Sequence, residues 1–133
     1  MRVAVAVIFD KKNRVLLTQR ALESSHGGLW EFPGGKLKDK EEPITALKRE
    51  IKEEVDLEII ESEFLCELTY HYAEQITLHV FCVNKFEGIP KCCEKQLNLR
   101  WVELAHLNYY DFPKANDHII EMLKRRSSVA ITE

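Results

Sequence analysis

Short apolar runs separated by turn residues fill the first quarter of the chain. Residues 3–9 and 14–19 are rich in β-branched and aliphatic side chains, which predicts two strands. Residues 10–13 between them, Asp-Lys-Lys-Asn, are typical of a hairpin turn. Residues 21–29 contain serines and glycines and predict a surface loop. Residues 30–32 predict a short extended piece that the following Pro-Gly-Gly breaks.

The pattern changes to a helical period after residue 42. Apolar side chains then recur every three or four residues, and residues 43–55 place them on one helix face: Ile44, Leu47, Ile51 and Val55. Pro43 suits the first turn, because the backbone N–H that proline lacks would be unpaired there. The sequence therefore predicts an amphipathic helix with one face in the core.

Further strands and a second helix follow. Residues 63–72 and 75–87 predict a long antiparallel pair, residues 99–102 predict another strand, and residues 116–126 predict a helix. The inward face of that helix would carry its apolar side chains: Ile119, Ile120 and Leu123. Strands combined with two main helices indicate an α+β fold, in which a mixed sheet packs against helices.

Composition supports one globular domain. The 133 residues are 45% hydrophobic and 31% charged, which excludes a disordered chain and leaves room for a single domain. We place that domain at residues 1–126, followed by a frayed C-terminal tail at residues 127–133. Nineteen basic and twenty-two acidic residues give a net charge of −3, which argues against a nucleic-acid polymer as partner.

Neither a membrane segment nor a disulfide framework is evident in the sequence. No apolar run approaches the ~20 residues that span a bilayer, and the N-terminus lacks the long apolar core of a signal peptide. The cysteines form no C-x-x-C pair, so we interpret them as reduced thiols: Cys66, Cys82, Cys92 and Cys93. We therefore expect a cytoplasmic protein without membrane contact, and we expect a monomer.

The helix over residues 43–55 carries three closely spaced glutamates. Glu50 is followed by Glu53 at i+3 and Glu54 at i+4, so the three carboxylates are neighbours on the helix surface and repel one another. Two interpretations stay open on spacing alone. One is a solvated acidic face. The other is a site for a divalent cation such as Mg²⁺, which prefers carboxylate oxygens and substrate phosphates.

The residues around these glutamates form a longer pattern. The stretch runs Gly35-x5-Glu41-x7-Arg49-Glu50-Ile51-x-Glu53-Glu54-x-Asp56-Leu57. It resembles the Nudix box, G-x5-E-x7-R-E-U-x-E-E-x-G-U with U an apolar residue, at every fixed position but one. Asp56 stands where the box has glycine. That residue follows the helix, so we expect it in the left-handed conformation, which aspartate tolerates better than most residues.

The resemblance to the Nudix family implies an α/β/α sandwich that hydrolyses nucleoside diphosphates linked to another moiety, with Mg²⁺ or Mn²⁺ as cofactor. It implies that Glu50, Glu53 and Glu54 bind the metal and that Glu50 also orients or deprotonates the attacking water. The carbonyl of Gly35 would be a further ligand, and Arg49 would pair with the box carboxylates. Because metal ions neutralise the anionic diphosphate, the protein should be inactive without them.

The chain looks closest to one branch of the family, the MutT hydrolases of oxidised guanine nucleoside triphosphates. The matching segments cover most of the chain: Arg20, Leu29–Lys36, Glu87–Pro90, Glu94, Trp101 and Asp111–Asn116. The resemblance implies that Glu94 lies near the metals, as a ligand or as the base. It implies that Asn116 hydrogen-bonds the oxidised purine, since an amide offers a donor and an acceptor to one base edge. Arg20 and Phe32 would line the nucleotide pocket, and His26 would face it.

Each of these nucleotide-binding assignments has a plainer alternative. Asn116 would also suit the N-cap of the last helix, a role that can coexist with base recognition. Glu94 would otherwise be an ordinary loop acid. Arg20 would be a surface charge at the end of a strand, and Phe32 a packing residue beside proline.

The sequence as a whole favours a Mg²⁺-dependent pyrophosphohydrolase that converts 8-oxo-dGTP or 8-oxo-GTP to the monophosphate and pyrophosphate, and so cleanses the nucleotide pool. One alternative is a sister branch that acts on CTP or modified pyrimidine nucleotides and tends to carry aspartate in place of Asn116. Another is a Nudix-fold nucleotide-binding module without hydrolysis, although the retained glutamates weigh against it. Whether Glu50 or Glu94 is the base stays open, as does ribose against deoxyribose.

Overall fold

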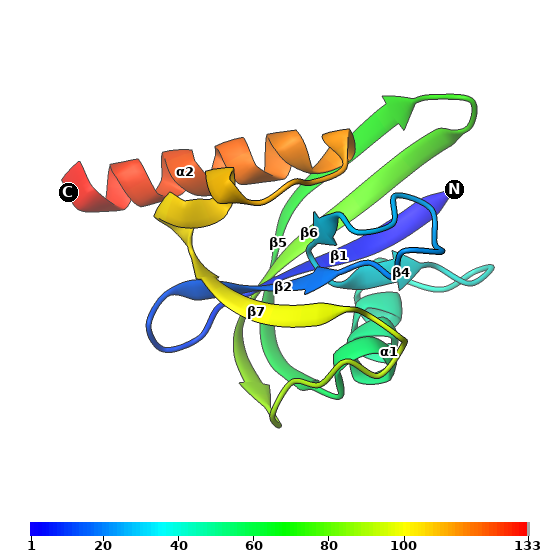
Figure 1. The fold of residues 1–133 in the computed structure, drawn as a ribbon, viewed down its shortest axis with the longest axis horizontal. Coiled ribbons are helices and arrows are strands. Elements are labelled where there is room, and N and C mark those ends of the chain that lie inside the picture. Colours follow the sequence, from blue (N-terminus) through cyan, green and yellow to red (C-terminus); the bar gives the residue numbers. More distant parts are fainter. Residues whose placement is uncertain (133) are drawn as a thin grey trace.

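Two helices enclose two β-sheets in a three-layer arrangement. The computed structural model describes the backbone of residues 1–132 and the side chains of residues 1–126. Helix α1 (Pro43–Val55) lies on one side of the strands, and helix α2 (Asp117–Thr132) lies on the other (Figure 1). The predicted α+β sandwich is therefore confirmed.

The strands are divided between a mixed sheet and an antiparallel sheet. The mixed sheet contains, in order, β4 (Gly34–Lys36), β1 (Arg2–Ile8), β6 (Gln75–Glu87) and β5 (Glu58–His71). Strands β1 and β6 run parallel, and the other two pairs of that sheet are antiparallel. The second sheet contains, in order, β3 (Trp30–Glu31), β2 (Arg14–Gln19) and β7 (Asn98–Glu103).

The turn between β1 and β2 forms as predicted, but the two strands do not make a regular hairpin. The N–H of Asp10 donates to the carbonyl of Arg14 at 3.0 Å, and the N–H of Arg14 donates to Asp10 Oδ1. Beyond that turn the strands share only the Phe9–Val15 bridge and then separate into different sheets. Strand β1 instead takes β6 and β4 as its partners, and its residues 4–8 are buried on both faces of the sheet.

Alternate residues of β1 supply two hydrophobic clusters. On the α1 side, Ala4, Ala6 and Ile8 pack with the buried face of that helix: Ala46, Leu47, Ile51 and Val55. On the α2 side, Val5 and Val7 pack with the buried residues of the second helix: Ile119 and Leu123. Because successive side chains of a strand point to opposite faces, one short strand connects both helices.

Several element boundaries differ from the predicted ones. Gly34–Lys36 forms β4 against β1 rather than a breaker, because glycine lets the two backbones approach closely. Strand β5 begins earlier than predicted and contains bulges. Helix α2 continues past the predicted end at Arg126 to Thr132. The division into a domain and a tail stays a prediction, and Glu133 lies outside the described residues.

Two short 3₁₀ helices, η1 (Leu104–Tyr109) and η2 (Lys114–Asn116), connect β7 to α2. Within the described part of the chain, each helix is too short or too polar to cross a bilayer. All four cysteines are free thiols, as the sequence predicts.

Candidate active site

The three glutamates of α1 differ sharply in exposure. Glu54 is buried, Glu50 has a side chain that is 16% exposed, and Glu53 has one that is 49% exposed. The predicted apolar residues of α1 pack into the core, so the glutamates lie at the boundary between the buried and the exposed faces of the helix. Neither a fully solvated acidic face nor a fully buried cluster describes this arrangement.

Arg49 connects the helix to the loop that precedes it. Its Nη1 donates to Glu50 Oε1 at 2.7 Å and to Glu53 Oε2 at 3.4 Å. Its Nε and Nη2 donate to the two oxygens of Glu41 at 3.0 and 2.8 Å, and Nη2 also donates to the carbonyl of Lys36. Hydrogen bonds from Arg49 lower the pKa of Glu41 to about 2. A bidentate guanidinium–carboxylate pair of this kind fixes the orientation of both side chains.

The backbone of β4 lies directly against the glutamates. A Cβ atom at Gly35 would overlap with the carboxyl group of Glu50, so any larger residue would displace that side chain. The N–H of Gly34 donates to Glu54 Oε2 at 2.8 Å. The two glycines are therefore needed for close approach, and they place the strand backbone beside the carboxylates.

Glu54 lies in an environment that disfavours its charged form. Burial raises its pKa to about 8, and the nearby carboxylates of Glu31, Glu94 and Glu50 contribute to the shift. Burial also raises the pKa of Glu94, assisted by Glu50 and Glu53. Partly buried carboxylates that lie close together form a negative region, which is the electrostatic environment that a bound cation would neutralise.

These carboxylates do not form a ready-made cage. Among the residues that the structure describes, no group of three acidic, histidine or cysteine side chains has the spacing of a metal site. Glu50 instead accepts from Arg49, and Glu54 accepts from Gly34. Such an open donor set suits Mg²⁺, which usually takes one or two protein carboxylates and completes its shell with water and substrate phosphates.

The loop after β6 covers the C-terminal end of α1 and brings Glu94 to the site. The Cys93 N–H and the Gln96 side-chain amide both donate to the Glu54 carbonyl at 3.0 Å, and the Lys91 N–H donates to the Val55 carbonyl. These bonds satisfy carbonyls that have no partner within the helix. The exposed side chain of Glu94 therefore lies close to the α1 glutamates, although it comes from a distant part of the chain.

Asp56 ends α1 in the conformation that the sequence predicts. Its φ and ψ are 59° and 37°, and its N–H donates to the carbonyl of Lys52. The carboxylate also accepts from Lys52 Nζ at 2.7 Å and lies 3.7 Å from Lys91 Nζ. The aspartate thus replaces a glycine at a left-handed C-cap and pairs with two exposed lysines.

One cleft of about 550 Å³ brings most of the candidate residues together. The metal candidates that line it are Gly35, Glu50, Glu54 and Glu94, and the nucleotide candidates are Arg20, His26, Phe32 and Asn116. Glu53 and Arg49 do not line the cleft. Both lie on α1 outside its lining, where Arg49 donates to Glu53 and Glu50.

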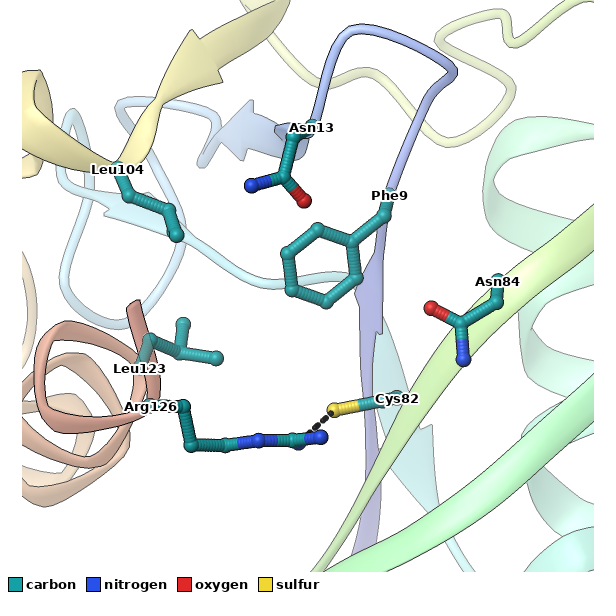
Figure 2. A pocket seen from close by; sticks show the side chains of 7 residues that line it. All are labelled: Phe9, Asn13, Cys82, Asn84, Leu104, Leu123 and Arg126. Atoms are coloured by element: carbon teal, nitrogen blue, oxygen red, sulfur yellow. Dashed lines mark hydrogen bonds between the residues drawn. The ribbon is translucent and has the colours of Figure 1, made fainter. Parts of the chain in front are cut away.

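A smaller cavity of about 260 Å³ lies between α2 and β6 (Figure 2). Its lining comprises Phe9, Asn13, Cys82, Asn84, Leu104, Leu123 and Arg126. In this cavity Arg126 Nη1 donates to Cys82 Sγ at 3.2 Å, and none of the lining residues is acidic. The chemistry suggested by the glutamates therefore belongs to the larger cleft.

The side chains at the nucleotide end of the cleft have defined partners. Arg20 Nη1 donates to Glu31 Oε1 at 2.7 Å, and Nε donates to the carbonyl of Ser25, so Arg20 is not an isolated surface charge. Phe32 is 4% exposed and stacks on Phe112 with ring centroids 5.6 Å apart. It is both a packing residue and part of the cleft wall. Within residues 1–126, no hydrogen bond occupies the side-chain amide of Asn116, whereas its backbone N–H donates to the Pro113 carbonyl.

Sequence reasoning missed one charged residue and the apolar wall of the cleft. Glu31 lines the cleft between Arg20 and Glu54, and burial raises its pKa. Its only sequence signal is a carboxylate placed between the aromatic residues Trp30 and Phe32. The apolar wall consists of Met1, Val3, Val5, Ile76 and Leu78; the sequence pattern places the last four in strands and carries no signal that they line a cleft.

Comparison with known proteins agrees with this geometry. Residues 4–122 match the NUDIX domain family. An 8-oxo-dGTP diphosphatase of Buchnera aphidicola is 37% identical over 118 residues, which cover 89% of each chain. The Escherichia coli 8-oxo-dGTP diphosphatase is 36% identical over 126 residues, 94% of this chain and 97% of the relative. A CTP pyrophosphohydrolase of E. coli is 32% identical over 118 residues, 88% of this chain and 87% of that protein.

The fold has close counterparts among solved structures. One comes from a structural and functional study of MutT from Aliivibrio salmonicida and Vibrio cholerae. It superposes with a TM-score of 0.84 and 29% identity, covering 95% of this chain and 99% of the other. The box sequence, the sandwich fold and the matched span of residues agree, and the chain therefore belongs to the NUDIX domain family.

Proposed function

We propose that the protein is a Mg²⁺-dependent pyrophosphohydrolase that converts 8-oxo-dGTP or 8-oxo-GTP to the nucleoside monophosphate and pyrophosphate. The observation that carries the proposal is the composition of the cleft of about 550 Å³. Carboxylates line one part of it, and an unoccupied amide with an apolar wall lines another. A nucleoside triphosphate has the matching arrangement of an anionic chain joined to an aromatic base.

The donor set fits a divalent cation. Glu50, Glu54 and Glu94 would hold it, with Glu53 and the Gly35 carbonyl as further candidates. The supporting observation is the raised pKa of Glu54 and Glu94, which burial causes first and neighbouring carboxylates increase, because a bound cation would stabilise their charged forms. When bound, Mg²⁺, or Mn²⁺ in its place, would neutralise the phosphate chain and lower the pKa of a coordinated water.

The chain's own residues supply orientation and proton transfer. Arg49 fixes Glu50 by a 2.7 Å hydrogen bond, which leaves the other oxygen of Glu50 directed at the backbone of Gly35. A carboxylate held in this way can orient a water molecule and accept its proton as the water attacks phosphorus. Glu94 is the second candidate for the base, since its loop brings it to the same cleft.

Asn116 is suited to reading an oxidised guanine. Guanine presents O6 and N7 as acceptors, whereas oxidation at C8 places a hydrogen on N7. An amide can donate to O6 and accept from that N7–H, while an aspartate could not donate. Apolar side chains of β1 and β6 beside Asn116 would cover the base: Val3, Val5, Ile76 and Leu78.

The first experiment compares initial rates at low substrate concentration with Mg²⁺ for 8-oxo-dGTP, dGTP, CTP and ADP-ribose. A kcat/KM for 8-oxo-dGTP that greatly exceeds the value for dGTP would support the proposal. A preference for CTP would favour the alternative, which is supported by the resemblance to a CTP pyrophosphohydrolase. Absence of turnover with every substrate would contradict hydrolysis and favour a binding module.

We also propose that the protein acts on free nucleotides as a cytoplasmic monomer. Sedimentation of the purified protein with and without Mg²⁺ would test the monomer.

A further inference from the structure

Asn116 lies in a segment that cannot fix its own conformation. It ends η2, a single 3₁₀ turn between Pro113 and the start of α2. Locally the turn has one hydrogen bond from the Asn116 N–H to the Pro113 carbonyl and another from the Asp117 N–H to the Lys114 carbonyl. Because so short a 3₁₀ turn is weakly stable, the direction of the Asn116 amide requires support from elsewhere in the fold.

That support comes from β5, far away in the sequence. The Tyr70 hydroxyl donates to the Ala115 carbonyl at 3.0 Å, and it lies 2.8 Å from His118 Nδ1. A hydroxyl has one hydrogen, so both contacts are satisfied when His118 donates through Nδ1–H and Tyr70 donates to Ala115. One hydroxyl therefore contacts the residue before Asn116 and the residue two positions after it.

The position of Tyr70 connects these contacts to the cleft. Tyr70 is opposite Ile76 in the β5–β6 register, and Leu68 is opposite Leu78. Ile76, Leu78 and Ala115 line the cleft, whereas Tyr70 and His118 do not. Residues directly opposite in an antiparallel pair share a face of the sheet, so the tyrosine lies beside Ile76 and just outside the cleft lining, in contact with the segment that carries Asn116.

We propose that Tyr70 and His118 are positioning residues that hold the Asn116 amide in the geometry needed to discriminate the oxidised base. This proposal rests on the proposed function, because it assigns to Asn116 the reading of the base. It adds that selectivity depends on a hydrogen-bonded link between β5 and the start of α2 in addition to the amide itself.

The test uses the full chain as wild type and as Tyr70→Phe, His118→Ala and their double variant. Tyr72→Phe is the matched control, since Tyr72 is exposed and only stacks on the Tyr70 ring. Two quantities are measured: kcat and KM for 8-oxo-dGTP and dGTP with Mg²⁺, and hydrogen exchange of the backbone amides of residues 114–118. Thermal unfolding of every variant separates a loss of positioning from a loss of fold.

Loss of the hydroxyl should raise KM for 8-oxo-dGTP about fivefold, the usual effect of one hydrogen bond, with kcat and the values for dGTP nearly unchanged. Hydrogen exchange at the backbone N–H of Asn116 should become faster. His118→Ala should change KM and exchange in the same direction. In the double variant the loss of binding free energy for 8-oxo-dGTP should be smaller than the sum of the losses in the two single variants. Tyr72→Phe should match the wild type in both measurements.

Unchanged exchange at residues 114–118 in Tyr70→Phe would overturn the proposal, and so would an equal loss for both nucleotides. His118→Ala keeps the proposal testable if Tyr70→Phe unfolds, because His118 is exposed. Failure of the proposed function looks different, since the wild type itself would then show no preference for 8-oxo-dGTP. In that case the exchange comparison alone decides whether Tyr70 positions Asn116.

Discussion

The two parts of the cleft are built in different ways. The carboxylate part comes mainly from one continuous segment, in which β4, the following loop and α1 place Gly35, Glu41, Arg49 and Glu50 in contact. The part proposed to bind the base is assembled from separate elements: β1, the loop after β2, β6, η2 and, beside β6 but outside the cleft lining, β5. The first is fixed by the charged hydrogen bonds of Arg49, and the second by apolar packing, the neutral hydrogen bonds of Tyr70 and one ion pair between Arg20 and Glu31.

This difference separates rate from selectivity. Charge-assisted bonds around Arg49 are strong and geometrically specific, so changes there should affect the reaction of every nucleotide. In the proposed binding mode the other part would contact only the base, so changes there should affect the choice between nucleotides. Each prediction below tests whether the two parts are as independent as their construction indicates.

Removal of divalent ions should have the largest effect. EDTA should abolish turnover of 8-oxo-dGTP and dGTP alike, because the facing carboxylates would then repel the triphosphate. Restoring Mg²⁺ should restore activity and raise the Tm, since a cation relieves repulsion in the folded state. Initial rates and calorimetry measure the two effects, and undiminished turnover in EDTA would contradict the metal assignment.

Glu53→Gln should come next, with a loss in kcat of about a hundredfold or more for both nucleotides. The Glu53 side chain is half exposed, so the fold and the Tm should stay close to those of the wild type. Glu61→Gln, on the exposed part of β5, is a matched control that should leave the rate unchanged. Near-normal activity of Glu53→Gln would exclude Glu53 from the metal site.

Asn116→Ala should lower the preference for 8-oxo-dGTP over dGTP about tenfold or more, because one amide would supply two hydrogen bonds to the base edge. Rates for dGTP should change little. The control is Asn84→Ala, an exposed amide that lines the smaller cavity. Equal losses for both nucleotides would show that Asn116 does not read the base. They would also show that the two parts of the cleft do not act independently on rate and selectivity.

The pH dependence of stability should report on the Glu41–Arg49 pair. The folded-state pKa of Glu41 is about 2, below its ordinary value of 4.5, so the pair stabilises the fold fully above about pH 5. That stabilisation is lost as the pH falls from 4.5 toward 2. The Tm of Glu41→Gln should therefore lie below that of the wild type at neutral pH, and the gap should shrink in acid. A gap independent of pH would contradict the assignment.

Asp56→Gly should have the smallest effect. Glycine adopts the left-handed conformation without strain, which offsets the loss of two exposed lysine pairs. The Tm should stay near that of the wild type. Asp56→Ala should lower the Tm, because alanine is strained in the left-handed conformation and cannot pair with the lysines. Unchanged kcat in Asp56→Gly would confirm that the departure from the box leaves the chemistry intact. A large gain in kcat would mean that Asp56 disturbs the carboxylate part.

Periodicity was sufficient for the elements that have a clear pattern. The bounds of α1 match the predicted residues. Its apolar stripe is buried, because side chains that recur every 3.6 residues lie on one helix face and can be buried together against the sheet. Strand β4 could not be predicted, because two glycines carry no pattern and pair only when β1 is already present. The separation of β1 and β2 likewise depends on β6, which is distant in sequence.

The sequence by itself determined the box, its helix and the chemical types of the candidate residues, because these depend on neighbours within a few turns of one helix. The tertiary structure decided which glutamates face the cleft, why Glu54 is hard to ionise, and how Glu31, Tyr70 and the apolar wall come to lie beside them. Burial, electrostatic repulsion and a hydrogen bond across 45 residues arise only when distant segments meet, and no local pattern encodes them.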